Sequence, residues 1–210
     1  MKHLFFIILA GVLYACNNEP VLIVTPAPVA TAATFITNEH FTANWHDVEG
    51  ADGYDLEIAT DVDFSAIILT EEDVVTGKII FGMDSKTEYF YRVRTKINGQ
   101  TPSVNSNVIS LYTLPDPPIA TAATNVTSDG FTANWNEVPG ISNYLLFLSL
   151  DGFSSNPPVY VPGYEGKDVT GTSSTVSGLS SNTIYYYAIK AKGDESISFY
   201  SNAIIAVTKN

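Results

Sequence analysis

The chain has 210 residues, of which 45% are hydrophobic and 15% charged, so it can bury the core of one large domain or of two ordinary ones. Ten basic and 22 acidic residues give a net charge of −12, which argues against nucleic acid as a partner because phosphate backbones attract basic surfaces. The single cysteine excludes an internal disulfide. Twelve tyrosines and 11 phenylalanines, together with many β-branched residues, favour strands over helices.

The first 15 residues have the pattern of a secretory signal peptide. Lys2 provides a positive start, and an almost wholly apolar run follows over residues 4–13. This run is too short for a membrane-spanning helix, which needs about 20 residues. The run ends in Leu13-Tyr14-Ala15-Cys16, which resembles the lipobox of bacterial lipoproteins.

That resemblance implies that residues 1–15 are removed and that Cys16 carries a lipid. The protein would then be anchored to a membrane, which we expect to be the outer membrane because Asn17 gives no obvious retention signal for the inner one. The alternative is an ordinary signal peptide with an incidental Cys16. Residues 16–27 contain Pro20 and Pro26 and are predicted to form an extended tether.

An internal repeat fills the rest of the chain. Ala30-Thr31-Ala32-Ala33-Thr34 recurs at residues 120–124, and Phe41-Thr42-Ala43-Asn44-Trp45 recurs at 131–135. Later landmarks are spaced more widely in the second copy, which indicates a small insertion there. We therefore predict one domain over residues 28–114 and another over 115–210, joined at a proline-rich segment.

Both copies consist of short alternating strands separated by turn residues, without a sustained helical period. The landmarks shared by the copies are a Trp that ends the second strand (Trp45, Trp135), a Tyr that starts the third (Tyr54, Tyr144), and an alternating aromatic segment (83–95, 179–191). In this order they resemble a tandem of fibronectin type III domains. The resemblance implies an all-β fold of two immunoglobulin-like β-sandwiches.

The same resemblance assigns roles to core residues. Trp45 and Trp135 would be buried between the sheets beside Tyr54 and Tyr144 respectively. Tyr89 and Tyr185 would be tyrosine corners, in which the hydroxyl group bonds to the backbone where the chain crosses between the sheets.

The sequence predicts no enzyme, no metal site and no cofactor. His40 and His46 would lie at opposite ends of one strand, too far apart to share a metal. Asp61 and Asp63 are predicted in one turn and residues 71–73 after the next strand, where solvated acidic loops explain them better than a calcium site.

The outward face of one pair of strands differs between the copies. In the first, Asp55 and Glu57 are predicted to lie opposite Arg92 and Arg94 as ion pairs. In the second copy, an exposed apolar strip is predicted instead, unless a neighbouring strand or the 159–164 loop covers it. With two aromatic residues of a later loop, it supplies the candidate binding residues: Leu145, Phe147, Tyr186, Phe199 and Tyr200.

These observations favour a non-enzymatic lipoprotein at the cell surface or in the periplasm. Its two domains would act as a binding or spacer module in adhesion or envelope assembly, with an unidentified protein or glycan as partner. The alternative is an accessory carbohydrate-binding lipoprotein of a glycan-uptake system. Aromatic residues exposed along one face would favour that alternative, with Tyr160, Tyr164, Phe199 and Tyr200 as candidates.

Overall fold

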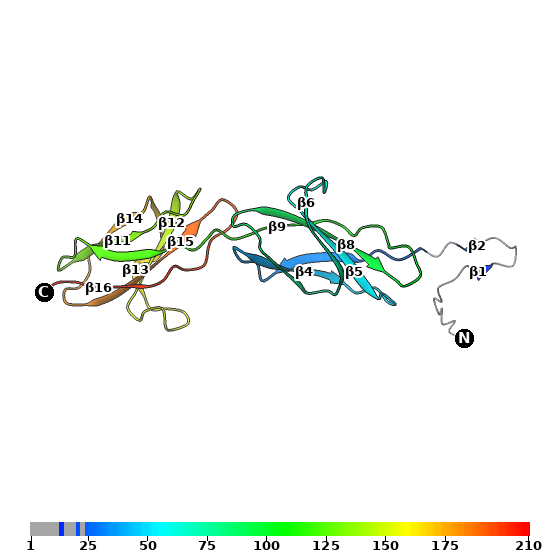
Figure 1. Ribbon diagram of the computed structural model, residues 1–210. Coiled ribbons are helices and arrows are strands. Elements are labelled where there is room, and N and C mark those ends of the chain that lie inside the picture. Colours follow the sequence, from blue (N-terminus) through cyan, green and yellow to red (C-terminus); the bar gives the residue numbers. More distant parts are fainter. Residues whose placement is uncertain (1–12, 15–19, 22–23) are drawn as a thin grey trace. The chain divides into compact units, whose positions relative to one another are not determined.

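The computed structural model describes residues 13–14, 20–21 and 24–210, and it is built from strands (Figure 1). Cys16 and most of the predicted signal peptide lie outside the described residues. A short antiparallel pair, β1 (Leu13–Tyr14) and β2 (Pro20–Val21), precedes the main body. From residue 24 onward the chain forms two compact units, each built around its own β-sandwich.

The first sandwich packs a three-stranded sheet against a four-stranded one. The smaller sheet has the order β3-β4-β7 and the larger one β6-β5-β8-β9, with all neighbours antiparallel. Its strands are β3 (Val29–Thr34), β4 (His40–His46), β5 (Gly53–Ala59), β6 (Ile67–Val74), β7 (Lys78–Phe81), β8 (Glu88–Lys96) and β9 (Ile109–Tyr112).

The second sandwich repeats this topology, with the orders β10-β11-β14 and β13-β12-β15-β16. Its strands are β10 (Ala120–Thr124), β11 (Gly130–Trp135), β12 (Asn143–Ser149), β13 (Tyr160–Thr170), β14 (Ser173–Ser177), β15 (Ile184–Lys192) and β16 (Ile204–Val207). This is the sheet arrangement of a fibronectin type III domain, so the predicted all-β fold with two such sandwiches is confirmed.

Alternation along the strands places one aromatic set inside each sandwich. Trp45 and Trp135 are each 3% exposed. The Trp45 ring centroid lies 5.4 Å from that of Tyr54, and the Trp135 centroid lies 5.6 Å from that of Tyr144. Each of these tyrosine hydroxyls accepts a backbone N–H from the loop that follows the tryptophan, so one pair of rings fixes that end of each core.

The two tyrosines predicted as corners are buried at equivalent places. Tyr185 lies in β15, and its hydroxyl accepts the backbone N–H of Ser180 at 3.0 Å. Tyr89 is 2% exposed in β8, and its ring stacks on Phe41 with centroids 6.5 Å apart. The Tyr185 side chain thus joins the crossing between the sheets to the core, and Tyr89 is buried at the matching position of the first sandwich.

The insertion in the second copy lies between β12 and the end of β13. The strand β13 has 11 residues, whereas the corresponding β6 has eight. The sequence pattern placed residues 71–73 after a strand, but Glu71, Glu72 and Asp73 lie within β6. There Glu71 pairs with Lys78 and Asp73 with Lys96, so these acids are part of the sheet surface and not of a loop.

Thr25, which falls in the predicted tether, packs against the first sandwich. It is 4% exposed, and its hydroxyl donates a hydrogen bond to the Thr101 carbonyl oxygen at 2.7 Å. Gln100 Oε1 lies 3.2 Å from the same hydroxyl oxygen. The chain is therefore fixed to the loop between β8 and β9 several residues before β3 begins.

Candidate functional site

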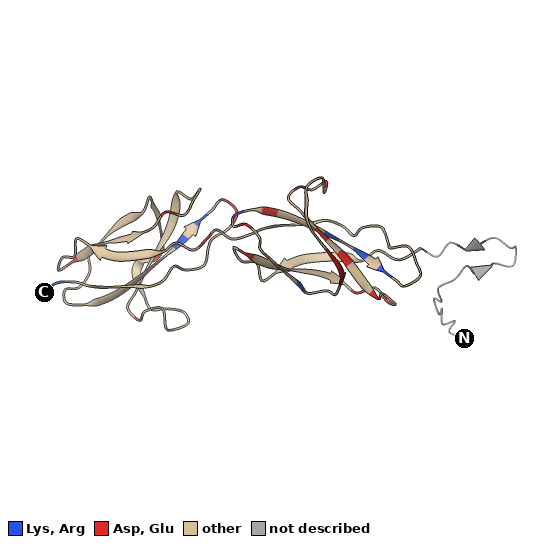
Figure 2. Ribbon diagram, in the orientation of Figure 1, with Lys and Arg blue, Asp and Glu red and all other residues tan. Residues whose placement is uncertain are grey.

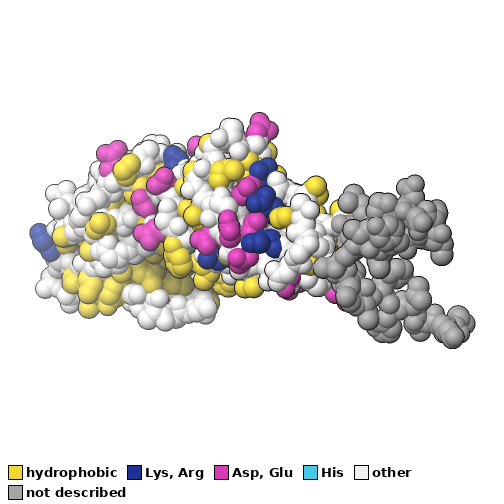
Figure 3. All heavy atoms as spheres, turned by 45° about the vertical axis from the view of Figure 1, so that its right-hand side comes forward, with side chains coloured by type: hydrophobic (Ala, Val, Ile, Leu, Met, Phe, Trp, Pro, Cys, Tyr) yellow, Lys and Arg dark blue, Asp and Glu magenta, His cyan; other side chains and the backbone are white. Residues whose placement is uncertain are grey.

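The outer face of the larger sheet in the first sandwich is a ladder of ion pairs. Asp55 lies opposite Arg94 and Glu57 opposite Arg92, with nitrogen–oxygen distances of 3.0 and 2.7 Å. Figure 2 shows these charged residues gathered on β5 and β8, and Figure 3 shows acidic and basic side chains next to one another there. The predicted pairing of charges is confirmed, and it leaves little unpaired charge on this face.

The same positions in the second sandwich carry a different chemistry. Leu145 lies opposite Lys190, and Phe147 lies opposite Ala188. Leu146 and Leu148, which alternate with them, are fully buried in the core, so Leu145 and Phe147 face outward as predicted. The carboxylates of the first sandwich are thus replaced by apolar side chains.

Phe147 is not exposed, however, and the prediction of an open apolar strip is wrong at this residue. Its side chain is 8% exposed, because Tyr160 and Tyr200 cover it on the outside of the sheet. Its ring centroid lies 4.8 Å from that of Tyr200, edge to face, and 5.9 Å from that of Tyr160. The sequence left open whether a neighbouring strand covers this face, and the structure shows that Tyr160 of β13 does so.

A bulge in β13 makes room for this packing. Leu146 pairs with Lys167 and Phe147 with Glu165, so Gly166 is an extra residue at this point of the ladder. Gly166 has a φ of +108°, and a Cβ there would lie 3.1 Å from the Phe147 ring. Glycine is therefore required both by the backbone conformation and by the ring beneath it.

Four rings meet on this face and are called the aromatic cluster below: Phe147, Phe153, Tyr160 and Tyr200. Phe153 lies 5.7 Å from Tyr200 and 6.3 Å from Tyr160 between ring centroids. The hydroxyl groups of Tyr160 and Tyr200 are hydrogen-bonded at 3.0 Å. Burial is the main cause that raises the pKa of Tyr200 well above its usual value, and the hydrogen bond with Tyr160 raises this pKa further. The Tyr200 hydroxyl is therefore protonated at neutral pH.

Lys190 lies above the aromatic cluster. Its ammonium nitrogen is 4.1 Å from the ring centroid of Tyr200 and 5.9 Å from that of Phe147, which places a cation over two aromatic rings. Burial lowers the pKa of Lys190 because the charged form loses water. The cluster thus combines apolar rings, two hydroxyls and one partly desolvated cation.

The other predicted binding residues lie at the margin of the cluster or away from it. Leu145 and Tyr186 are half-buried, and the Tyr186 ring lies close to Gly152 in the loop after β12. Phe199 is 53% exposed but is not among the ring contacts of the described residues. Tyr164, considered as an exposed aromatic residue, is 9% exposed within the hydrophobic core, where the β13 bulge directs it.

The sequence reasoning did not find Phe153 or the role of Lys190. Phe153 lies in the loop after β12, where the second copy is longer than the first. The wider spacing of the repeat indicated an insertion, and its aromatic residues Phe153 and Tyr160 were the available signal. For Lys190 the signal was the repeat itself, which aligns Lys190 with Arg94 and places Leu145 where the first copy has Asp55.

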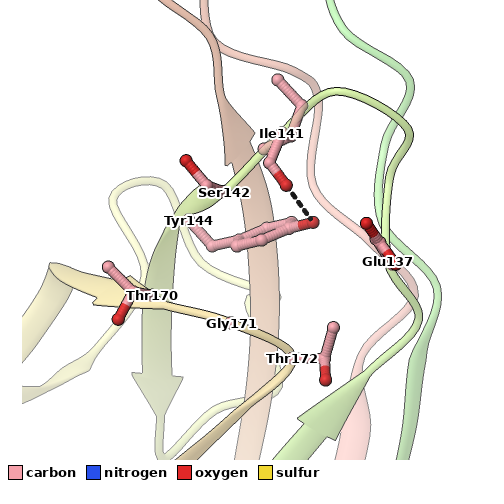
Figure 4. Close-up of a pocket in the computed structure, with 7 residues that line it drawn as sticks. All are labelled: Glu137, Ile141, Ser142, Tyr144, Thr170, Gly171 and Thr172. Carbon is pink, nitrogen blue, oxygen red and sulfur yellow. Dashed lines mark hydrogen bonds between the residues drawn. The ribbon is translucent and has the colours of Figure 1, made fainter.

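A second candidate is a hollow of about 370 Å³ at the loop end of the second sandwich (Figure 4). The Tyr144 ring and Ile141 form its apolar part, and the Tyr144 hydroxyl donates to the Ile141 carbonyl oxygen at 3.2 Å. Its polar lining comes from Glu137, Ser142, Thr170 and Thr172. One carboxylate and three hydroxyls could bind a small polar group, but they provide no paired acids for glycoside chemistry.

Within residues 24–210, no group of three or more His, Cys, Asp or Glu side chains has the arrangement of a metal site. A search of the described residues also found no helix long and apolar enough to cross a membrane.

The chain is 26% identical over 196 residues to chitinase A1 of Niallia circulans, a match that covers 86% of this chain and 25% of the chitinase. It therefore spans about a quarter of the length of that relative. No protein family model matches the chain.

Two solved structures are similar to the chain. The two-domain fibronectin type III segment of chicken tenascin has a TM-score of 0.49 and 19% identity, covering 86% of this chain and 99% of that one. Domains FN1–FN3 of chicken CNTN1 have a TM-score of 0.45 and 15% identity, covering 95% of this chain and 76% of that one.

Proposed function

We propose that this protein is a non-enzymatic binding module held at a membrane by a lipid on Cys16, with a glycan as the ligand of its second sandwich. The observation that carries the proposal is the aromatic cluster with its two hydroxyls. The cluster lies on the outer face of the larger sheet, and the same face of the first sandwich carries ion pairs instead. The first sandwich then serves as a spacer between the anchor and the binding face.

The glycan class is favoured by the chemistry of the cluster. Sugar rings pack their C–H faces on aromatic side chains, and their hydroxyls exchange hydrogen bonds with groups such as Tyr160 and Tyr200. Tyr200 is 38% exposed and so accessible to a ligand. The similarity to a protein named chitinase supports a polysaccharide context, although it covers only a quarter of that protein.

Binding is tested with full-length protein purified in detergent and a panel of acidic and neutral polysaccharides. Replacing Tyr200 by Ala removes the exposed ring, so we expect the Tyr200→Ala variant to lose at least tenfold in affinity. Tyr112→Ala is the matched control, because Tyr112 lies in the first sandwich and is 39% exposed. Unchanged binding by Tyr200→Ala, or no binding to any polysaccharide, would contradict the proposal.

The anchor rests on the sequence alone, on the apolar run and on the single cysteine at the end of it. The Cys16→Ala variant should leave the membrane fraction, whereas the Tyr112→Ala variant should remain there. A Cys16→Ala variant that fractionates like the wild type would exclude lipid attachment at this residue. Fractionation of outer from inner membranes then tests the proposed outer-membrane location.

The proposal of a non-enzymatic role rests on the absence of a nucleophile–base pattern in the sequence. His40 and His46 lie at opposite ends of β4, and the hollow at the loop end has a single carboxylate. Glycosidase and esterase assays on the purified protein test this point, and any turnover that depends on Glu137 would overturn it.

A further inference from the structure

Lys190 is a cation without the acidic partner that the equivalent residue of the first sandwich has. In the first sandwich the equivalent Arg94 lies opposite Asp55 and pairs with it at 3.0 Å. In the second sandwich the residue opposite Lys190 is Leu145. The position therefore retains a cation on the sheet surface while the carboxylate is absent.

The neighbouring charges do not replace that carboxylate. On the same strand, Lys192 pairs with Asp168 of β13. Glu165, which lies opposite Phe147, accepts the backbone N–H of Gly163 at 2.9 Å. Within residues 24–210 Lys190 forms no ion pair, and its recorded partners are the rings of Phe147 and Tyr200. Burial costs this ammonium part of its hydration, so a ligand anion there would meet less competition from water.

We infer that the glycan bound at the aromatic cluster is acidic, with a sugar carboxylate that pairs with Lys190. The inference rests on the proposed function. In a uronic acid the carboxylate is attached to the ring itself, so one sugar unit presents a C–H face, hydroxyls and a negative charge together. These match the rings, the Tyr160 and Tyr200 hydroxyls, and the ammonium group, and a charge-assisted bond to Lys190 would be among the strongest contacts.

The test compares polysaccharides that differ only in charge. Polygalacturonate, alginate and hyaluronan are each assayed beside their carboxyl-reduced forms, with full-length protein in detergent at low and high salt. We expect at least one of the acidic forms to bind at least tenfold more tightly than its reduced form, and salt to diminish this difference.

Lys190→Met removes the charge and keeps the length of the side chain, so it should abolish the preference for the acidic form. Lys190→Gln provides a second variant, and thermal melting verifies that both are folded. Lys167→Met is the matched control, because Lys167 also lies over a tyrosine ring of this sandwich, 4.9 Å from the Tyr164 centroid. It should keep the preference.

Equal binding of the acidic and reduced forms, still lost in Tyr200→Ala, would overturn this inference and leave the proposed function intact. Tight, Lys190-dependent binding of poly-glutamate, equal to that of the polysaccharides, would show that the partner is an acidic polypeptide and would overturn the inference. Failure to bind any polysaccharide would overturn both proposals.

Discussion

Asn202 forms both backbone hydrogen bonds of Ala120. Its side-chain oxygen accepts the Ala120 N–H at 2.9 Å, and its side-chain nitrogen donates to the Ala120 carbonyl at 3.0 Å. Asn107 and Ala30 repeat this arrangement in the first sandwich at 2.9 and 3.0 Å. One amide thus closes the start of the first strand in each sandwich, where no neighbouring strand satisfies the backbone.

Replacing Asn202 by Ala should lower the free energy of unfolding of the second sandwich by about 1–3 kcal/mol, because a buried N–H and C=O lose their partners. Chemical denaturation followed by circular dichroism measures the loss. Asn136→Ala, at an exposed position, is the control and should change stability little. Equal effects of the two variants would show that the bonds to Ala120 contribute nothing.

Trp45→Ala should destabilise the first sandwich by about 3–5 kcal/mol, because it empties the core beside Tyr54. The chain has two tryptophans, one in each sandwich, so Trp135 fluorescence in this variant reports on the second sandwich alone. Hydrogen exchange should become faster in β8, where the core is disrupted. A loss below about 1 kcal/mol would mean that the cavity collapses readily.

Phe147→Ala should cost the second sandwich about 3 kcal/mol even though the ring lies on the outer face, because it is covered on all sides. Phe147→Leu should cost less than half of that amount. The measurement is the denaturation midpoint of each variant. A cost for Phe147→Ala within experimental error of zero would indicate that Tyr160 and Tyr200 do not cover the ring in solution.

Lys190→Met should not lower the stability of the protein at neutral pH, since the lowered pKa of Lys190 shows that its charged form is disfavoured in the folded state. The unfolded chain then holds this proton to a higher pH than the folded one. The wild type should therefore gain stability from this group as the pH rises from the lowered pKa towards the ordinary lysine value of about 10.4. Thermal melting between neutral pH and that value should show no such gain in the variant.

Asp61 should stabilise the loop between β5 and β6 at neutral pH but not in acid. Its carboxylate accepts the backbone N–H groups of Ser65, Ala66 and Asp63, at 3.0, 2.7 and 3.1 Å, and these bonds lower its pKa, that from Ser65 contributing most. A lowered pKa stabilises the folded state above the unfolded value, and this contribution is lost as the pH falls through the folded one. Asp61→Ala should thus melt earlier than the wild type at pH 7, with a gap that closes in acid. The control Asp63→Ala should show no such gap.

The strands and their faces could be predicted from the sequence because alternation determines both. The strand predicted to begin at His40 and end at His46 does so, and Trp45 lies on its inner face. The charge pairs of β5 and β8 followed from the same alternation. A period of two residues gives the direction of each side chain, whatever packs against it later.

What covers an outward side chain does not follow from alternation. Phe147 faces outward as expected, but its burial depends on a bulge at Gly166 and on a loop that brings Phe153 close to Tyr200. The same bulge turns Tyr164 into the core. Bulges and loop conformations depend on tertiary packing, so the aromatic cluster could be recognised only from the structure.

The hydrogen bond from Thr25 to Thr101 fixes where the first sandwich begins, and so sets the length of the segment between it and Cys16. With a lipid on Cys16, the chain between the membrane and Thr25 could extend to about 30 Å at most, given about 3.5 Å per residue. The first sandwich would then sample a hemisphere of that radius instead of diffusing through the compartment. Its effective concentration towards any membrane-bound neighbour would be high, so weak contacts with other proteins of the same membrane would suffice for assembly.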